Sequence, residues 1–497
     1  MLGAMCGLLL CGRAEAQSIR FPWSGHGHDA QHSTISPVPA QPLNRILWQT
    51  RVDENPQYSG SSLLIHYGSP LITRSNTVIV PVKTGAAGGF LVRALDGVTG
   101  ATNWTQTTDY RWPPHNWGPS FSPTLTPQNR LYFPGGGGTV YYRDTPDAVS
   151  GATGQIAFYG FANYNADTNA YLANVFINTP ITADRYGNIY FGFQVTNSTP
   201  VALTSGVARI DFNGDATWIS ASAAADDGEM TKVVPNCAPA LGNDHKTLYV
   251  AVKGSSYGYL VALDSRTLAP LATIRLKDAK TPANDAVLSE NGTASPTIAP
   301  DGDVYYGVLG NPTTANHYRG WLLHFDGALT QTKVPGGFGW DDTASVVPAS
   351  LVAAYQGSSS YLLMTKYNNY AGSGGDGVNQ LAILDPHDSM TDPISGATVM
   401  KEILTIAGPT PDAGITNSFP NAVREWCINT AAVDPFTKSV LVNNEDGKLY
   451  RWDLTSNTLI QPVVLTAGIG EAYTPTIIGV DGIVYAINNA ILFAVGR

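Results

Sequence analysis

Reactive side chains gather at recurring places in a chain that has few charges. Only 13% of its 497 residues are charged, yet acidic, basic and aromatic residues stand together just ahead of several similar segments. These residues are Arg111, His115, Trp117, Glu290, Asn291, Trp340, Asp341, Asp342, Arg424, Glu425, Trp426 and Tyr473. Carboxylates, imidazoles and phenols can exchange protons, and aromatic rings can wall a ligand site. We predict a polar pocket with aromatic walls, suited to a sugar-like or small anionic ligand.

The same residues leave other interpretations open. A polysaccharide lyase needs an arginine to neutralise a uronate carboxylate, and a histidine or tyrosine as base and acid. Arg111, Arg424, His115 and Tyr473 are of these types. The structural alternative is that such side chains only satisfy loop backbone groups and fill a central channel.

Repeated segments must position these residues. Each begins with a small residue, usually followed by proline, and continues through an apolar run and a polar turn into a second apolar strand, as in a hairpin. The segments begin at Ser69, Ser122, Thr179, Ala238, Ser295, Thr430 and Thr474, and a degraded copy begins at Ser345. Most lie about 50 to 60 residues apart, which is the length of one four-stranded propeller blade with its loops.

The repeats predict an all-β fold, an eight-bladed β-propeller of four-stranded antiparallel blades, with seven blades as the fallback. The last repeat has room for three strands only, so we expect Ile46–Val52 to complete it and close the ring. The long interval after Ser345 indicates two inserts in blade six, Lys366–Gln380 and Asp385–Thr398. Long loops in compact folds are often functional, so we expect Tyr367–Tyr370 to contact a ligand or a partner.

The stretch ALDGVTGATNW resembles the repeat of the pyrroloquinoline-quinone-type (PQQ-like) propeller family. That repeat reads Ala-x-Asp-x-x-Thr-Gly-x-x-x-Trp, and its positions are matched here by Ala94, Asp96, Thr99, Gly100 and Trp104. The resemblance implies that the tryptophan packs between adjacent blades. Weaker copies lie at 208–220, 259–276 and 448–465. The segment from Trp23 onward also looks like the lead-in of secreted members of the family.

The resemblance leaves the function open, because many proteins of this architecture bind no quinone. A quinoprotein needs calcium, a base and an aromatic plate for PQQ. Glu290, Asn291 and Asp341 or Asp342 could hold calcium and supply the base, while Trp117, Trp340 and Trp426 are candidates for the plate. The adjacent cysteine pair common in quinone-binding alcohol dehydrogenases is absent, as is any Cys-x-x-Cys-His haem motif. We therefore expect a ligand-binding, protein-binding or scaffolding role. A PQQ- and calcium-dependent oxidoreductase is the alternative, and a polysaccharide lyase ranks third.

The first residues and the overall charge indicate export and exclude nucleic acid. Residues 1–16 resemble a signal peptide with Ala14-Glu15-Ala16 as its cleavage site, 17–45 form a lead-in segment, and 46–497 form one propeller domain. A net charge of −10 offers no basic stripe for phosphates, and no apolar run is long enough to span a membrane. We predict a secreted or periplasmic monomer whose partner is a small molecule, a carbohydrate or a protein.

Neither the histidines of the lead-in nor the cysteines predict a metal site or a bridge. The tract His26, His28, Asp29 and His32 has a spacing that fits no structural zinc pattern, so we predict no metal there. Cys237 and Cys427 precede blades four and seven, too far apart around a ring for a disulfide. We expect two free, buried thiols.

Overall fold

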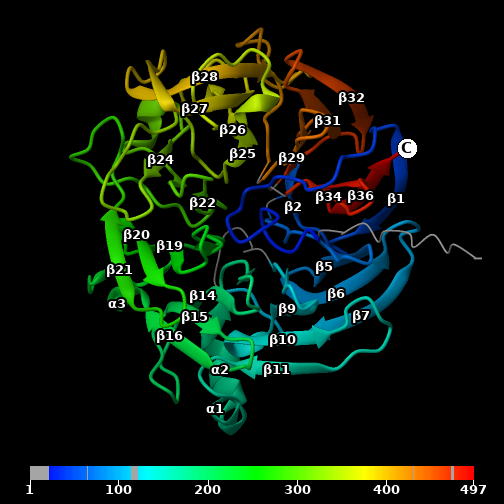
Figure 1. Ribbon diagram of the computed structural model, residues 1–497, viewed down its shortest axis with the longest axis vertical. Helices are drawn as coiled ribbons and strands as arrows, with labels where there is room; N and C mark the ends of the chain where they lie inside the picture. Colours follow the sequence, from blue (N-terminus) through cyan, green and yellow to red (C-terminus); the bar gives the residue numbers. More distant parts are fainter. Residues whose placement is uncertain (1–21, 64, 114–120, 429, 472–474) are drawn as a thin grey trace, which may run out of the picture.

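The computed structural model shows eight small antiparallel sheets arranged around a central axis (Figure 1). It describes residues 22–497 except 64, 114–120, 429 and 472–474. The predicted all-β, eight-bladed propeller is confirmed. The helices described are short, namely α1 (Phe161–Ala166), α2 (Thr168–Asn174) and α3 (Ala221–Ala225). None of the helices in these ranges has the length and apolar content needed to cross a bilayer.

The first four blades follow one another in sequence, each from its inner to its outer strand. Blade one contains β4 (Leu71–Ile72), β5 (Thr77–Gly85), β6 (Gly88–Asp96) and β7 (Thr102–Thr108). Blade two contains β8 (Thr124–Leu125), β9 (Arg130–Pro134), β10 (Thr139–Asp144) and β11 (Thr153–Ala157). Blade three contains β12 (Val175–Ile177), β13 (Thr182–Ala183), β14 (Ile189–Val195), β15 (Gly206–Ile210) and β16 (Ala216–Ser220). Blade four contains β17 (Lys232–Val233), β18 (Ala240–Leu241), β19 (Thr247–Lys253), β20 (Gly258–Asp264) and β21 (Pro270–Arg275).

The other blades complete the ring. Blade five contains β22 (Thr297–Ile298), β23 (Val304–Val308) and β24 (Trp321–Phe325). Blade six contains β25 (Ser345–Pro348), β26 (Tyr361–Tyr367), β27 (Gln380–Thr391) and β28 (Thr398–Ala407). Blade seven contains β29 (Ala432–Asp434), β30 (Ser439–Asn443), β31 (Lys448–Asp453) and β32 (Thr458–Val464). Blade eight contains β34 (Ile477–Ile478), β35 (Val484–Asn488), β36 (Ile491–Gly496) and β1 (Arg45–Arg51). A separate small sheet joins β2 (Tyr58–Ser59), β3 (Ser62–Leu63) and β33 (Gly470–Glu471).

Blade eight closes the ring by joining the two ends of the propeller. Its outer strand β1 runs antiparallel to β36, with Arg45 opposite Gly496 and Arg51 opposite Ile491. Pairing of an N-terminal strand with the last blade leaves no open edge between first and last repeat. The predicted closure is therefore confirmed, with the strand at Arg45–Arg51.

The small residue at the start of each repeat links neighbouring blades. The backbone N–H of Ser69 donates to Ser122 Oγ at 3.1 Å, and the N–H of Ala238 donates to Ser295 Oγ at 2.9 Å. Ser295 in turn donates its N–H to Thr343 Oγ1 at 3.1 Å. Buried N–H groups need such partners, which explains why a hydroxyl residue recurs at this position.

The turn within ALDGVTGATNW is tied together by Asp96. Its Oδ1 accepts hydrogen bonds from the N–H groups of Val98 and Thr99 and from the Thr99 hydroxyl. Gly100 has a φ of +71°, a conformation that costs an L-residue about 1–2 kcal/mol. Trp104 then donates from Nε1 to Pro146 O of blade two at 2.7 Å, so its indole spans the seam between blades one and two.

Two features of the outer strands differ from the expectation. Blade five has only three strands, and its fourth is reduced to two isolated bridges, Leu322 with Gly336 and Phe325 with Thr332. The expected insert at Asp385–Thr398 is an extension of β27 and β28 that ends in a further copy of the Asp96-type turn, with Asp392 accepting from Ser395.

The lead-in segment runs along the inner strands and lies across the centre of the ring (Figure 1). Backbone hydrogen bonds join Trp23 to Ile72, Ser24 to Leu125, Ala30 to Leu241, Gln31 to Ile298, Ser33 to Val346, Thr34 and Ser36 to Val433, and Gln41 to Gly482. These contacts reach seven of the eight blades. The segment therefore joins the inner parts of these blades. The cysteines Cys237 and Cys427 are free and buried, as expected.

Candidate functional site

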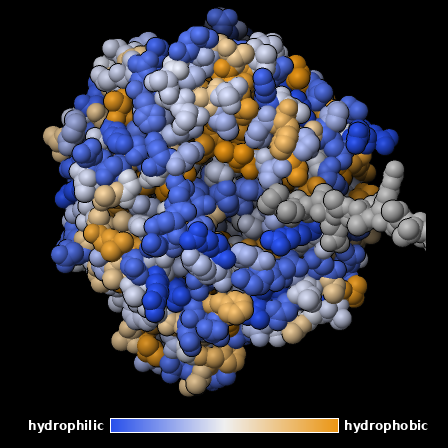
Figure 2. All heavy atoms as spheres, in the orientation of Figure 1, coloured by the Kyte–Doolittle hydropathy of each residue, from blue (hydrophilic) through white to orange (hydrophobic). Residues whose placement is uncertain are grey.

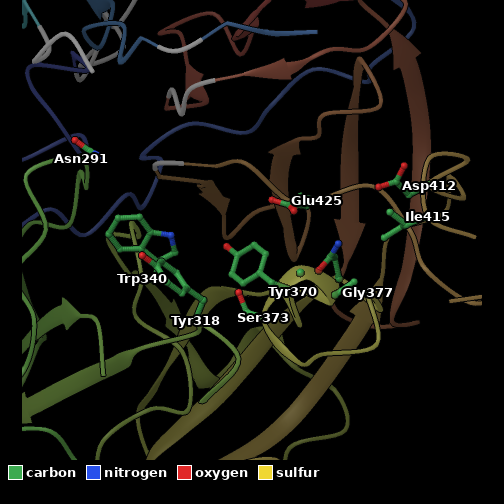
Figure 3. Close-up of a pocket in the computed structure, with 12 residues that line it drawn as sticks. Asn291, Tyr318, Trp340, Tyr370, Ser373, Gly377, Asp412, Ile415 and Glu425 are labelled. Atoms are coloured by element: carbon green, nitrogen blue, oxygen red, sulfur yellow. The ribbon is translucent and has the colours of Figure 1, made fainter. Parts of the chain in front are cut away.

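A cavity of about 460 Å³ opens among the loops of blades five, six and seven (Figure 3). It is lined by Asn291, Tyr318, Trp340, Tyr370, Ala371, Gly372, Ser373, Gly377, Asn379, Asp412, Ile415 and Glu425. The loops that lead into β22, β25 and β29 supply Asn291, Trp340 and Glu425, while the β26–β27 connection supplies Tyr370. The face shown in Figure 2 is hydrophilic around its centre.

Three half-buried aromatic rings form the wall of this cavity. Tyr318 and Trp340 stand nearly perpendicular, with an interplanar angle of 85° and ring centroids 6.1 Å apart, so they make a corner. The backbone N–H of Trp340 donates to Arg319 O at 3.0 Å, which ties the two loops together. The third ring, Tyr370, lies beside Glu425 in Figure 3.

Two acidic side chains, Glu425 and Asp412, line the cavity. Burial raises the pKa of Glu425, and the nearby Glu445 carboxylate adds to the rise. Asp412 lies 3.8 Å from Arg424 Nη1, measured from its Oδ1. Among the described lining residues there is no lysine, arginine or histidine, so the lining offers no positive charge to the small anionic ligand considered from the sequence.

Asparagines hold the β26–β27 connection in place. Asn379 Oδ1 accepts from the Asn369 N–H at 3.0 Å, and Asn379 Nδ2 donates to Val423 O at 2.8 Å. The Val423 N–H donates back to Gly377 O at 3.0 Å. These bonds join the insert of blade six to the loop before blade seven, which is why Tyr370 and Glu425 come from distant segments to one cavity.

A buried polar group lies behind the cavity wall. Asp341 accepts from the N–H and hydroxyl of Thr293 at 2.6 and 2.7 Å, and its Oδ2 lies 3.7 Å from Lys366 Nζ. Burial raises the pKa of Asp342 to about 8; the charge of Lys366 opposes this rise and that of Asp341 adds to it. Asp342 is thus a carboxyl group that can take or give a proton near neutral pH.

The structure gathers some of the residues singled out from the sequence and separates others. Asn291, Trp340 and Glu425 line the cavity, and Asp341 and Asp342 lie buried behind it.

The remaining candidates lie elsewhere. Arg424 is at the rim beside Asp412, and Arg111 is exposed. Trp426 is fully buried in the core of blades six and seven, where its backbone N–H donates to Asn368 Oδ1. His115, Trp117 and Tyr473 lie outside the described residues.

Sequence reasoning missed Tyr318 and Asp412. Tyr318 belongs to the connection between β23 and β24, and Asp412 to a long loop after β28. Neither position directly precedes a repeat, so the periodicity that marked the other loops gave no signal for them.

Glu290 does not fit the calcium role considered from the sequence. Its carboxylate lies 2.6 Å from Lys232 Nζ and 3.3 Å from Lys253 Nζ, measured to Oε1. Two ammonium groups therefore already neutralise it, and they would repel a divalent cation. The described lining also offers no basic side chain to the carboxyl groups of PQQ. Glu290 is thus not available as the calcium ligand that the sequence suggested.

Two other groups could offer metal ligands. Glu425, Cys427 and Glu445 place one ligand atom each within 4.8 Å of one another, and so do Asp301, Asp303 and His387. In the first group Cys427 Sγ donates to Glu445 Oε1 at 3.1 Å. Burial raises the pKa of the Cys427 thiol, which keeps it protonated and weakens it as a metal ligand.

The comparisons with known proteins agree on the fold. No protein-family model matches the chain, and no curated protein matches it. Among solved structures, a europium-containing methanol dehydrogenase superimposes with a TM-score of 0.56 at 10% identity, covering 93% of this chain and 88% of that one. The quinohemoprotein alcohol dehydrogenase from Comamonas testosteroni gives 0.53 at 12% identity, covering 96% and 77%. The chain therefore has an eight-bladed propeller fold similar to that of these two dehydrogenases.

Proposed function

We propose that this protein binds a small polar molecule, of carbohydrate type or similar size, in the cavity formed by blades five, six and seven. One observation carries the proposal, the aromatic corner of Tyr318 and Trp340 opposite the polar side chains of Glu425 and Asn291. Ligand sites in proteins are concave, largely apolar, and fixed by a few polar groups.

The volume of the cavity and the hydrogen bonds that order its loops support this proposal. A volume of about 460 Å³ falls within the range of roughly 300–1,000 Å³ typical of small-molecule pockets. The hydrogen bonds of Asn379 join the β26–β27 connection to the loop before blade seven, and such prior ordering of loops lowers the cost of binding.

The test is a binding screen by tryptophan fluorescence and calorimetry, with neutral mono- and disaccharides and small polar amines. Replacing Trp340 by alanine removes one wall, and we expect affinity for any hit to fall about tenfold or more. Trp218→Ala, a half-buried tryptophan of β16 in blade three, is the matched control and should leave affinity unchanged. Equal affinity in wild type and Trp340→Ala would place the ligand elsewhere.

A PQQ-dependent oxidoreductase is the second candidate, supported by the fold shared with two alcohol dehydrogenases. When bound, PQQ supplies the redox chemistry of such enzymes. Titration with PQQ and calcium, followed by quinone absorbance and dye reduction, tests it. Stoichiometric binding of PQQ and dye reduction with an alcohol would favour this candidate over the binding role. Incubation with a uronate polymer, followed by the ultraviolet absorbance of unsaturated products, tests the polysaccharide lyase in parallel.

We also propose that the protein is exported. Support comes from the signal-like pattern of residues 1–16, which lie outside the described residues. N-terminal sequencing of the protein isolated from its native cell tests this, with Gln17 expected as the first residue.

A further inference from the structure

We infer that the ligand of this cavity carries an organic ammonium group, such as an amino sugar, a choline-like amine or a methylated amine. The inference rests on the proposed ligand site and names the chemistry that the site selects. It depends on two independent properties of the lining, the arrangement of its rings and its acidic side chains.

The rings have the arrangement that suits a cation. The perpendicular faces of Tyr318 and Trp340 form a corner, and Tyr370 lines the same cavity (Figure 3). A cation within about 6 Å of an aromatic centroid is attracted by the ring quadrupole, and tryptophan and tyrosine are the strongest partners. Several rings meeting at an angle can each present a face to one ammonium group.

The polar side chains around the rings also suit a cation. Asp412 and Glu425 both line the cavity, and the described lining residues contribute no basic side chain. Arg424 Nη1 lies 3.8 Å from Asp412 Oδ1 at the rim and neutralises part of that charge. Glu425 is therefore the carboxyl group that a bound ammonium group would meet beside the rings, and a nearby cation favours the ionised form of a carboxyl group.

The experiment compares choline with its neutral isostere 3,3-dimethylbutan-1-ol by isothermal titration calorimetry on the full chain. We expect choline to bind at least about tenfold more tightly than the alcohol. Trp340→Leu removes the ring but keeps an apolar side chain, and Glu425→Gln removes the carboxyl group. Both should bring choline down to the affinity of the alcohol.

Two matched variants separate these effects from general damage. Glu229→Gln removes an exposed carboxylate outside the cavity, and Trp218→Leu removes an indole in another blade; both should bind choline as the wild type does. Circular dichroism and thermal midpoints confirm that every variant is folded.

The outcomes distinguish this inference from the proposed function. If a neutral sugar binds through Trp340 and choline does not, the ammonium inference is overturned while the cavity remains a ligand site. If choline and the alcohol bind equally, the inference is also overturned. If no probe binds and Trp340→Ala changes nothing, the proposed function fails with it.

Discussion

A single glycine decides how blades one and eight approach each other. A Cβ added to Gly100 would lie 2.7 Å from the Trp48 indole, which packs directly over the turn. Trp48 also donates from Nε1 to Gly97 O at 3.0 Å. The glycine therefore serves two purposes, the positive φ of the turn and the close approach of a ring from the neighbouring blade.

We predict that Gly100→Ala destabilises the protein by about 2–4 kcal/mol, the sum of a left-handed backbone cost and of overpacking against Trp48. Gly396→Ala is the matched control, because Gly396 has a φ of +72° in the same kind of turn and open space around it. The free energy of unfolding of Gly396→Ala should fall only by the backbone contribution, about 1–2 kcal/mol. Equal losses in urea unfolding of the two variants would show that the Trp48 contact contributes nothing.

At the residue scale the candidate site was predictable only where it follows the repeat. Trp340, Glu425 and Asn291 precede inner strands, and the propeller places all such loops on one face. Trp426 stands in the same kind of loop but points into the core. Neighbours along an irregular loop can face opposite ways, and no periodicity in the sequence tells which one faces the cavity.

Among the elements, the lead-in segment has a role that its composition did not indicate. Its histidines are enclosed by the channel: His26 is 4% exposed and His32 is 0% exposed. Their rings meet edge to face with centroids 5.0 Å apart. His32 Nδ1 lies 2.7 Å from Pro296 O, a contact that a neutral ring protonated at Nδ1 satisfies. The tract is thus part of the packing between the lead-in and the blades.

Acid should release this segment. Burial lowers the pKa of His32 to about 4, although its contact with Pro296 and the charge of Asp29 oppose the shift, and burial also lowers the pKa of His26. A folded pKa below the unfolded value of about 6.5 means that the stabilisation is complete above about pH 6.5 and is lost as pH falls toward about 4. For His32 the loss amounts to roughly 3 kcal/mol.

His32→Asn removes the titrating ring and retains a side-chain N–H for Pro296. We expect the variant to be less stable at neutral pH but to show a shallower fall of the thermal midpoint between about pH 6.5 and about pH 4.5. His387→Asn, which replaces a partly exposed histidine, should keep the slope of the wild type. An unchanged slope in His32→Asn would mean that the lead-in does not set the acid stability.

For the whole molecule, the number of blades and the mode of closure could be predicted because both follow from repetition. Most repeats in the sequence place a short inner strand after a hydroxyl residue. The deficit of one strand at the C-terminus pointed to the N-terminal strand at Arg45–Arg51. The path of residues 23–41 could not be predicted, since it depends on contacts with seven separate blades. The three-stranded form of blade five depends on the irregular stretch after β24, which carries no strand pattern.

Among the described strands, the ring is closed at one place by hydrogen bonds alone, where the N-terminal strand β1 pairs with the C-terminal strand β36. Trp48 supports this junction, since its ring packs on Tyr485 of β35 with centroids 5.6 Å apart and on the turn of blade one. We predict that Trp48→Ala destabilises the protein by about 3 kcal/mol or more and detaches β1 before the rest of the ring unfolds. Limited proteolysis with mass spectrometry should then show early cleavage between β1 and β4.

The control is Trp218→Ala, which removes an indole of β16 in blade three, where the chain is continuous. This variant should lose comparable stability without the early cleavage, because no chain end can separate there. Cleavage at the same sites and rates in both variants would mean that the ring opens as one cooperative unit and that its noncovalent junction is no weaker than its other seams.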